Sequence, residues 1–203
     1  MRVLGINGSP HSNGNTSVML GWVLEELETE GVETEVFDLA GKPLTGCIDC
    51  RRCFKNKDKK CGVTSDALND VIERILAADG VVIGSPTYFC NVPATVKALI
   101  ERVGFVNIAN DGMLKRKVGA AAIVARRGGA IDTFNAVNHL FLHAQMIVPG
   151  SSYWNMGYGG RDQEVRSDAE AERTMRTLGQ NIAWVLRKTL AEQRVDRACE
   201  ADD

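Results

Sequence analysis

The first candidate site is a polar loop that follows a short apolar segment near the start of the chain. Residues 3–6 are apolar, the loop after them is rich in Asn, Gly, Ser and His, and a helical pattern begins near residue 14. The first N–H groups of a helix have no partner inside the helix, and the helix dipole favours negative charge there. The pattern therefore predicts an anion site, with phosphate as the first ligand to consider.

The spacing within this loop distinguishes between kinds of phosphate. A Walker loop needs a lysine after its second glycine, but Gly14 is followed by Asn15 and Thr16, and the G-x-G-x-x-G spacing of dinucleotide folds is missing too. The candidate ligands are side-chain donors: Ser9, His11, Ser12, Asn13, Asn15 and Thr16. They suit a phosphate monoester with a charge of about −1.5 to −2, such as the one that ends flavin mononucleotide (FMN). The alternative is an ordinary turn in which these residues only cap the helix.

The second candidate site is a group of cysteines in a long loop predicted over residues 40–64. Cys47, Cys50, Cys53 and Cys61 have the spacings x2, x2 and x7. Zinc sites usually pair two C-x2-C arms across a longer gap. Three cysteines that are three residues apart, with a fourth shortly after them, suit a 4Fe–4S cluster that one loop surrounds. Bound zinc and free or partly oxidised thiols are the alternatives.

The cysteine loop is also strongly basic. Against Asp49 and Asp58 it carries six cations, which are Arg51, Arg52, Lys55, Lys57, Lys59 and Lys60. A 4Fe–4S centre with four thiolates is anionic, so these cations would favour its reduced form and attract an acidic ferredoxin. The alternative for the charges is a solvated loop.

Strand and helix patterns alternate along the chain and define the elements that position these sites. Strands are predicted at residues 3–6, 34–39, 80–84, 118–125 and 145–148, and helices at 14–30, 66–78, 93–103, 130–145 and 167–190. A capping box of Ser167 with Glu170 marks the start of the last helix. The apolar strands predict a parallel sheet covered on both faces, in a doubly wound, three-layer α/β domain. This single domain is expected over residues 1–193, with a cysteine-rich loop at 46–62 and a disordered acidic tail at 194–203.

Ligands of such folds bind at the carboxyl ends of the strands, where loops 7–16, 85–92 and 126–130 are expected to meet. The second loop supplies Pro86, Thr87, Tyr88, Phe89 and Asn91, and the third supplies Arg126, Gly128 and Gly129. Aromatic surface, an amide and a guanidinium suit a flavin ring, and the glycines permit close approach. The alternatives are aromatic residues that cap the core and a solvated arginine.

Composition limits the remaining possibilities. The chain has 203 residues, a hydrophobic fraction of 44% and a net charge of −2, which indicates one globular domain and argues against a nucleic-acid partner. No apolar run reaches membrane-spanning length and no export signal is evident, so we expect a cytoplasmic protein without a membrane partner. In a reducing compartment, cysteines favour ligand or redox roles over disulfides.

Two motifs, GSP-x3-GNT after the first strand and GSPTYFCNVPATVK after the third, resemble those of the NADPH-dependent FMN reductases. The cysteine spacing resembles that of the iron–sulfur flavoproteins, a branch of the same family. The resemblance implies a flavodoxin-like fold with a five-stranded sheet of order 2-1-3-4-5, bound FMN, and a homodimer or homotetramer in which a neighbouring subunit helps to cover the flavin. The aromatic run at 153–158 either covers the flavin or buries a subunit contact.

The leading functional hypothesis is an FMN-dependent oxidoreductase that passes electrons between FMN, a 4Fe–4S cluster and a partner such as ferredoxin. Since the cofactors carry the chemistry, no catalytic side chain is assigned. One alternative is an NAD(P)H-dependent reductase of FMN, quinones or azo compounds without an assembled cluster, whose partners are NAD(P)H and a small oxidant. Another alternative is a non-catalytic flavin electron carrier or redox sensor.

Overall fold

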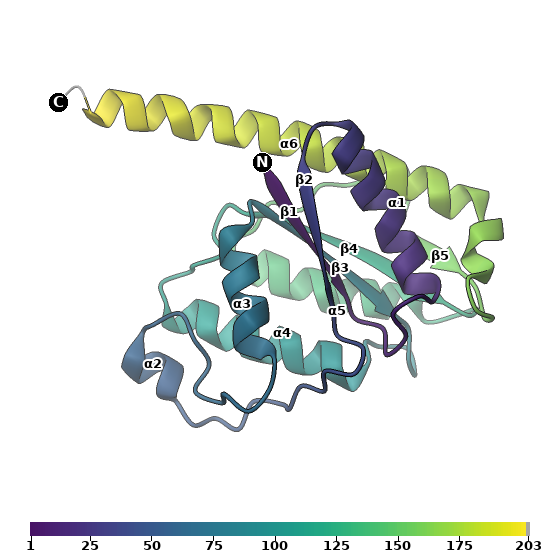
Figure 1. Ribbon diagram of the computed structural model, residues 1–203, viewed down its shortest axis with the longest axis horizontal. Coiled ribbons are helices and arrows are strands. Elements are labelled where there is room, and N and C mark those ends of the chain that lie inside the picture. Colours follow the sequence, from purple (N-terminus) through teal and green to yellow (C-terminus); the bar gives the residue numbers. More distant parts are fainter. Residues whose placement is uncertain (202–203) are drawn as a thin grey trace.

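Five parallel strands form the centre of the fold, in the order β2-β1-β3-β4-β5. The computed structural model (Figure 1) describes residues 1–201, with side chains described as far as residue 190. The strands are β1 (Arg2–Asn7), β2 (Glu33–Asp38), β3 (Gly80–Pro86), β4 (Val118–Ala125) and β5 (Met156–Tyr158). Every neighbouring pair is parallel, which confirms the predicted flavodoxin-like sheet.

Helices cover both faces of this sheet and complete the three layers. Figure 1 shows α1 (Asn15–Thr29) and α6 (Ala169–Ala201) on one face, and α3 (Leu68–Ala77), α4 (Ala94–Ala109) and α5 (Ala130–His143) on the other. Successive strand residues point to opposite faces. Val3 and Val82 therefore join the apolar cluster under α1 and α6, whereas Leu4 and Ile83 join the cluster under the other three helices.

The register of the central strands brings three loops to one edge of the sheet. Asn7 of β1 pairs with Gly84 of β3, and Pro86 of β3 pairs with Val124 of β4, so the three strands end close together. Strand order reverses between β1 and β3. This reversal marks the edge where open α/β sheets bind their ligands.

The segment between β2 and α3, which contains four cysteines, is mostly irregular. It holds one short helix, α2 (Arg52–Asn56), inside the region predicted to be a loop. Figure 1 shows α2 below the sheet, beside α3 and α4. None of the residues of α2 is buried, so this segment depends on contacts with its neighbours for a fixed position.

The fifth strand lies later in the chain than predicted. Of the predicted strand at 145–148, only Ile147 forms an isolated bridge, with Val118 at the start of β4. Pro149 follows at once and has no N–H to donate to a ladder. The chain then returns to the sheet at β5, which pairs with the end of β4.

The last helix also differs from the prediction. A 3-10 helix, η1 (Glu164–Ser167), precedes α6, which runs well past the predicted end at residue 190. The tail predicted at 194–203 is therefore helical as far as Ala201, and residues 202–203 lie outside the described part of the chain. Among the helices of residues 1–201, α6 included, none combines the length and apolarity that a membrane span requires.

The cap of α6 is Asp168, so the predicted capping box of Ser167 with Glu170 is wrong. Asp168 Oδ1 accepts a hydrogen bond from the N–H of Ala171 at 3.0 Å, and its Oδ2 accepts one from the N–H of Tyr158 at 3.0 Å. The hydroxyl of Ser167 instead donates back to the carbonyl of Glu164. One carboxylate therefore caps α6 and ties it to β5.

Replacing Asp168 by Ala is expected to lower the free energy of unfolding by about 1–2 kcal/mol, because the helix cap and the bond to β5 are lost together. Ser167→Ala is the matched control and should change it by less than about 0.5 kcal/mol. Urea unfolding followed by circular dichroism measures both variants. Equal losses in the two variants would contradict the assignment of the cap.

Candidate functional site

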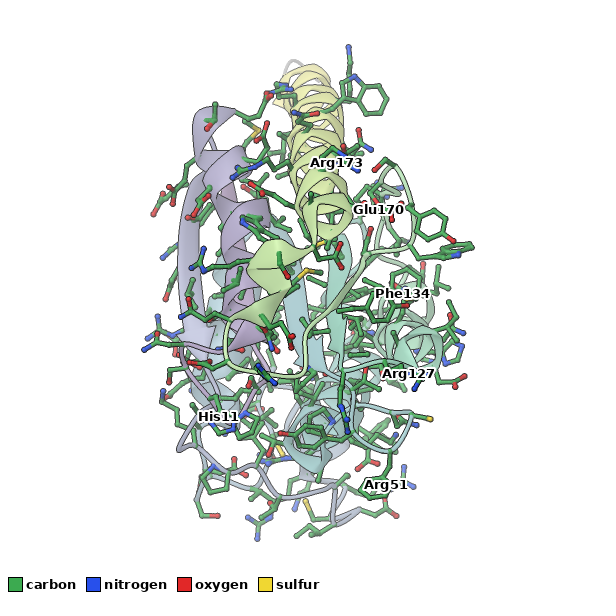
Figure 2. All side chains as sticks on the ribbon, turned by 90° about the vertical axis from the view of Figure 1, so that its right-hand side faces the viewer. His11, Arg51, Arg127, Phe134, Glu170 and Arg173 are labelled. Atoms are coloured by element: carbon green, nitrogen blue, oxygen red, sulfur yellow. The ribbon has the colours of Figure 1, made fainter. Side chains whose placement is uncertain are left out.

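A cavity of about 720 Å³ opens at the carboxyl ends of the central strands. A cavity of this size accommodates a drug-sized ligand or a cofactor. Its lining includes ten of the predicted cofactor residues: Ser9, His11, Ser12, Asn13, Asn15, Thr16, Pro86, Thr87, Tyr88 and Arg126. Figure 2 shows His11 and Arg127, from two of the loops, at the lower end of the molecule, with Arg51 of the cysteine segment at the same end.

Asn7, which the sequence analysis did not single out, shapes the loop after β1. Its Nδ2 donates to Asp38 Oδ1 at 3.0 Å and lies 3.4 Å from the carbonyl oxygens of His11 and Ser12. Its Oδ1 accepts the N–H of Ser9 at 3.1 Å. These bonds use both the N–H groups and the oxygen of the buried Asn7 amide, and the loop folds around this side chain. Asp38, the last residue of β2, thus supports Asn7.

Several polar groups of the cavity lack a partner within the protein. Gly14 precedes α1 as its N-cap residue and supplies no side-chain cap. The Oγ1 atom of Thr87 is buried and has no hydrogen-bond partner, although the N–H of Thr87 donates to Val124 at 2.7 Å. A buried hydroxyl without a partner costs free energy unless a ligand supplies one. An uncapped helix start and an unpaired hydroxyl in one cavity fit a ligand with an anionic end and a polar ring edge, as FMN has.

The loop between β5 and η1 forms a further wall of the cavity that the sequence analysis missed. Gly159, Gly160, Arg161 and Asp162 line it. Asn15 fixes this wall, because its Nδ2 donates to the carbonyls of Gly159 and Arg161, at 3.2 and 2.7 Å, and its Oδ1 accepts the N–H of Val165. A Cβ at Gly159 would lie 2.7 Å from the backbone N of Val165 and 3.0 Å from Asn15 Oδ1, so this close approach needs glycine.

Glu164, the first residue of η1, also fixes the loop between β5 and η1. Its Oε2 accepts the N–H of Arg161 at 2.8 Å and the N–H of Gly160 at 2.7 Å. These two bonds, that of Arg161 first, hold the pKa of the Glu164 carboxyl below its ordinary value. The wall therefore consists of backbone held by two side chains, a contact that hydrophobic patterning does not reveal.

Four predicted cofactor residues lie outside the lining of the cavity. The side chain of Phe89 is fully exposed, and Asn91 Oδ1 accepts the N–H of its neighbour Val92. Gly129 has a φ of +83°, and a Cβ there would lie 2.7 Å from Cys90 Sγ, while Gly128 has open space around it. Gly129 thus permits the close packing of loops 85–92 and 126–130, and the structure does not place these four residues in the lining of the cavity.

The four cysteines of the long segment line a second, smaller cavity. Cys47 and Cys50 are exposed, Cys53 and Cys61 are half-buried, and all four are free thiols. Burial raises the pKa of the Cys53 thiol. Within residues 1–190, no three His, Cys, Asp or Glu side chains converge closely enough to hold a single metal ion. The four cysteines therefore line one small cavity, of about 20 Å³, and their sulfurs do not meet at one point.

Cys61 is the most firmly held of the four cysteines. Asn69 of α3 binds its backbone on both sides: Oδ1 accepts the N–H of Cys61 at 2.8 Å and Nδ2 donates to its carbonyl at 3.1 Å. Arg102 of α4 donates to the Cys61 sulfur from Nε and Nη2, each at 3.3 Å. The position of this sulfur is therefore set by two helices outside the cysteine segment.

Arg102 is a buried cation with one carboxylate partner, Asp66, just before α3. The side chain of Arg102 has no exposed surface and that of Asp66 is 6% exposed. Burial works to raise the pKa of the Asp66 carboxyl, but the bond and charge of Arg102, together with two backbone hydrogen bonds, outweigh it and hold that pKa below its ordinary value. The two backbone bonds come from the N–H groups of Thr45 and Leu68.

This ion pair makes the stability of the protein depend on pH. The depressed pKa of Asp66 contributes stability above its unfolded value of about 4, and that contribution is lost as pH falls through the folded value. At pH 7, Asp66→Asn is expected to cost about 3–5 kcal/mol, because Arg102 is left buried without its partner. The difference from wild type should shrink as pH falls from 5 to 3.

Urea unfolding at several pH values, with metal-free protein, measures this difference. Asp111→Asn is the control, because the Asp111 side chain is 89% exposed and lies at only 4.0 Å from Lys57. A constant gap between wild type and Asp66→Asn across the pH range would contradict the linkage.

The chain is similar to known flavoproteins. Residues 1–161 match the family model of the NADPH-dependent FMN reductases. Two iron–sulfur flavoproteins of Methanocaldococcus jannaschii are 34% and 33% identical to it, over 92% and 94% of this chain and 98% and 93% of theirs. The crystal structure of RosB with bound 8-demethyl-8-formylriboflavin-5'-phosphate shares the fold. It has a TM-score of 0.75 at 18% identity, covering 100% of this chain and 88% of its own.

These matches extend over nearly the whole chain and agree with the sheet order and the position of the cavity. The chain therefore belongs to the NADPH-dependent FMN reductase family, on its iron–sulfur flavoprotein branch, and is an FMN-dependent oxidoreductase.

Proposed function

We propose that this oxidoreductase passes electrons between FMN in the cavity at the strand ends, a 4Fe–4S cluster in the cysteine segment, and a one-electron partner such as ferredoxin. FMN exchanges two electrons as a hydride or one at a time, whereas a 4Fe–4S cluster exchanges one. The observation that carries the proposal is the cavity shared by all four cysteines, with a buried guanidinium bonded to one sulfur.

The FMN phosphate would lie at the start of α1. Ser9, Ser12 and Thr16 line the cavity there, and His11 and Asn13 complete the loop. The helix start favours a dianion because its N–H groups and dipole point toward it. Asn15 would act indirectly, since its amide already holds the wall formed by loop 159–162.

The flavin ring would lie toward β3 and β4. The buried hydroxyl of Thr87 has no hydrogen-bond partner in the protein, and a polar atom at the edge of the ring would supply one. Tyr88 provides an aromatic surface, and Arg126 provides a cation. A cation near the ring would stabilise an added negative charge. Phe89, Asn91, Gly128 and Gly129 remain proposed contacts at the rim.

The donor set of the second cavity suits a cluster better than zinc. Zinc sites usually pair two C-x2-C arms across a longer gap, whereas these four cysteines follow one another in one segment with the spacings x2, x2 and x7. A cubane spreads its four thiolates around a larger core. Cys47, Cys50, Cys53 and Cys61 would be its ligands, with Cys61 already in a fixed position.

The basic surface around the cysteines suits an acidic electron carrier. Arg51 is paired with Asp49 at 2.7 Å, but Lys55 and Lys60 are exposed and form no ion pair with any described side chain. Uncompensated surface cations attract an acidic partner and speed its association.

We also propose that the protein works as a homodimer or homotetramer. Tyr153, Trp154 and Tyr158 are about half exposed or more, beside the wall formed by loop 159–162. A second copy covering this aromatic surface would also narrow the mouth of the FMN cavity.

The second candidate function is an NAD(P)H-dependent reductase of FMN, quinones or azo compounds that lacks a cluster. Cys47 and Cys50 are exposed, and the bond from the Cys47 N–H to Glu101 is long, at 3.4 Å, which favours this candidate. Rapid NAD(P)H oxidation by iron-free protein would support it. A carrier or redox sensor would show neither that turnover nor reduction through ferredoxin.

Changing Cys50 or Cys61 to Ser should remove iron and sulfide while leaving the two flavin absorption bands in place, because the cysteine cavity and the strand-end cavity have separate linings. Iron and sulfide assays and absorption spectra of protein purified without oxygen measure this. Cys90→Ser, outside the cysteine segment, is the control and should keep both cofactors. Wild-type protein that contains flavin but no iron or sulfide would contradict the proposal of a cluster.

Reversing two charges in Lys55→Glu/Lys60→Glu should raise the KM for an acidic ferredoxin about tenfold and flatten its dependence on salt, because electrostatic attraction is lost. The matched control is Arg173→Glu/Lys188→Glu, which makes the same change in net charge at exposed positions of α6, on the other face of the sheet from α4. Steady-state reduction at several salt concentrations measures the effect. Equal responses of both pairs would contradict a specific docking surface.

A further inference from the structure

Arg102 is buried in the centre of α4, and each of its five N–H groups has an acceptor. Nη1 donates to Asp66 and to the carbonyl of Thr45 at 3.1 Å. Nη2 donates to the carbonyl of Val63 at 3.1 Å and to Cys61 Sγ at 3.3 Å, and Nε donates to the same sulfur at 3.3 Å. A guanidinium with every donor used has one orientation.

Two of those five bonds converge on one sulfur, which is an unusual use of a buried cation. A neutral thiol is only a weak acceptor. A thiolate bound to a metal centre keeps negative charge, and a bond from a guanidinium to an anion is shorter and roughly twice as strong as a neutral one. The side of Arg102 that faces Cys61 is therefore built for an anionic sulfur.

The two arginines of the cysteine segment have other partners. Arg51 pairs with Asp49, and Arg52 donates from Nη1 to the carbonyl of Gly62 at 3.1 Å. Among the hydrogen bonds of residues 1–190, only those of Arg102 reach a sulfur of the four cysteines. Water and salt screen the attraction between the exposed cations and the cysteine sulfurs, whereas the buried Arg102 contacts the Cys61 sulfur directly and is screened much less.

We infer that Arg102 is a positioning residue that raises the reduction potential of the cluster through its two bonds to the Cys61 sulfur, an inference that rests on the proposed function. One-electron reduction adds one negative charge, part of which is carried by the ligand sulfurs. Hydrogen bonds to those sulfurs stabilise the reduced form more than the oxidised form, and outer bonds of this kind tune iron–sulfur potentials. Asp66 holds the guanidinium in place and balances its charge.

The test is a potentiometric titration of the reduced cluster, followed by electron paramagnetic resonance (EPR), in Arg102→Lys and in Arg52→Lys. Both variants keep a positive charge and lose a guanidinium, but only Arg102 bonds to sulfur. In Arg102→Lys, the ratio of reduced to oxidised cluster at the wild-type midpoint should fall about tenfold, which corresponds to about 59 mV for a one-electron couple. Arg52→Lys should leave the midpoint unchanged.

An unchanged midpoint in cluster-loaded Arg102→Lys, or an equal fall in both variants, would overturn the inference. If Arg102→Lys folds without a cluster, a second measurement decides. The Arg51→Lys/Arg52→Lys variant, grown with arginine labelled with 15N in the guanidinium, is reduced and measured by pulsed EPR. A 15N coupling to the cluster supports the role of Arg102, and its absence overturns it.

Iron and sulfide content separates the two levels of the argument. Wild-type protein without iron and sulfide would overturn the proposed function and this inference together. If wild-type protein holds a cluster, but Arg102→Lys has the wild-type midpoint potential or no 15N coupling to the arginine is seen, this inference is overturned and the proposed function stays in place.

Discussion

Parallel pairing of β1, β3 and β4 is the constraint on which both sites depend. Because these strands run in one direction and end near one another, the loops after Asn7, Pro86 and Ala125 start at the same edge. Each helix that follows a strand begins at this edge and runs back along the sheet, antiparallel to the strands. The starts of α1 and α4 therefore lie at the same edge as the three loops. A cavity lined by backbone N–H groups and hydroxyls follows from the topology, before any particular side chain is considered.

The sequence predicted the parts of the structure that local patterns determine. Apolar runs such as residues 80–84 indicated buried parallel strands, and the polar loop between β1 and α1 lines the cavity at the edge of the sheet where a site was expected. Helix periodicity located α1, α3, α4 and α5 to within a few residues, apart from the longer carboxyl end of α4. These features depend on neighbours in the chain, which is why a single sequence reveals them.

The missed features depend on contacts between distant residues. β5 has only three residues and pairs with β4 through a segment without strand periodicity, whereas residues 145–148 have the periodicity but are stopped by Pro149. Asn15 resembles a phosphate ligand by position, yet its amide is used by a loop 144 residues away in the chain. Arg102 reads as an ordinary helix cation, and only the fold shows that Cys61, Asp66 and Thr45 surround it.

The geometry of α4 shows how an irregular cysteine segment could serve the proposed cluster. α2 has no buried residue, so the segment cannot fix its own sulfurs by packing. α4 starts beside the loop that carries Tyr88, and eight residues later, roughly 12 Å along the helix axis, Arg102 holds Cys61. On the same helix, Glu101 accepts the N–H of Cys47 at 3.4 Å. Because α4 is packed against the sheet along its length, the two cavities keep a fixed separation even while Cys47 and Cys50 remain exposed. The rigid element is thus the helix that connects the two cavities, and for the proposed cluster the loop would need only to supply ligands.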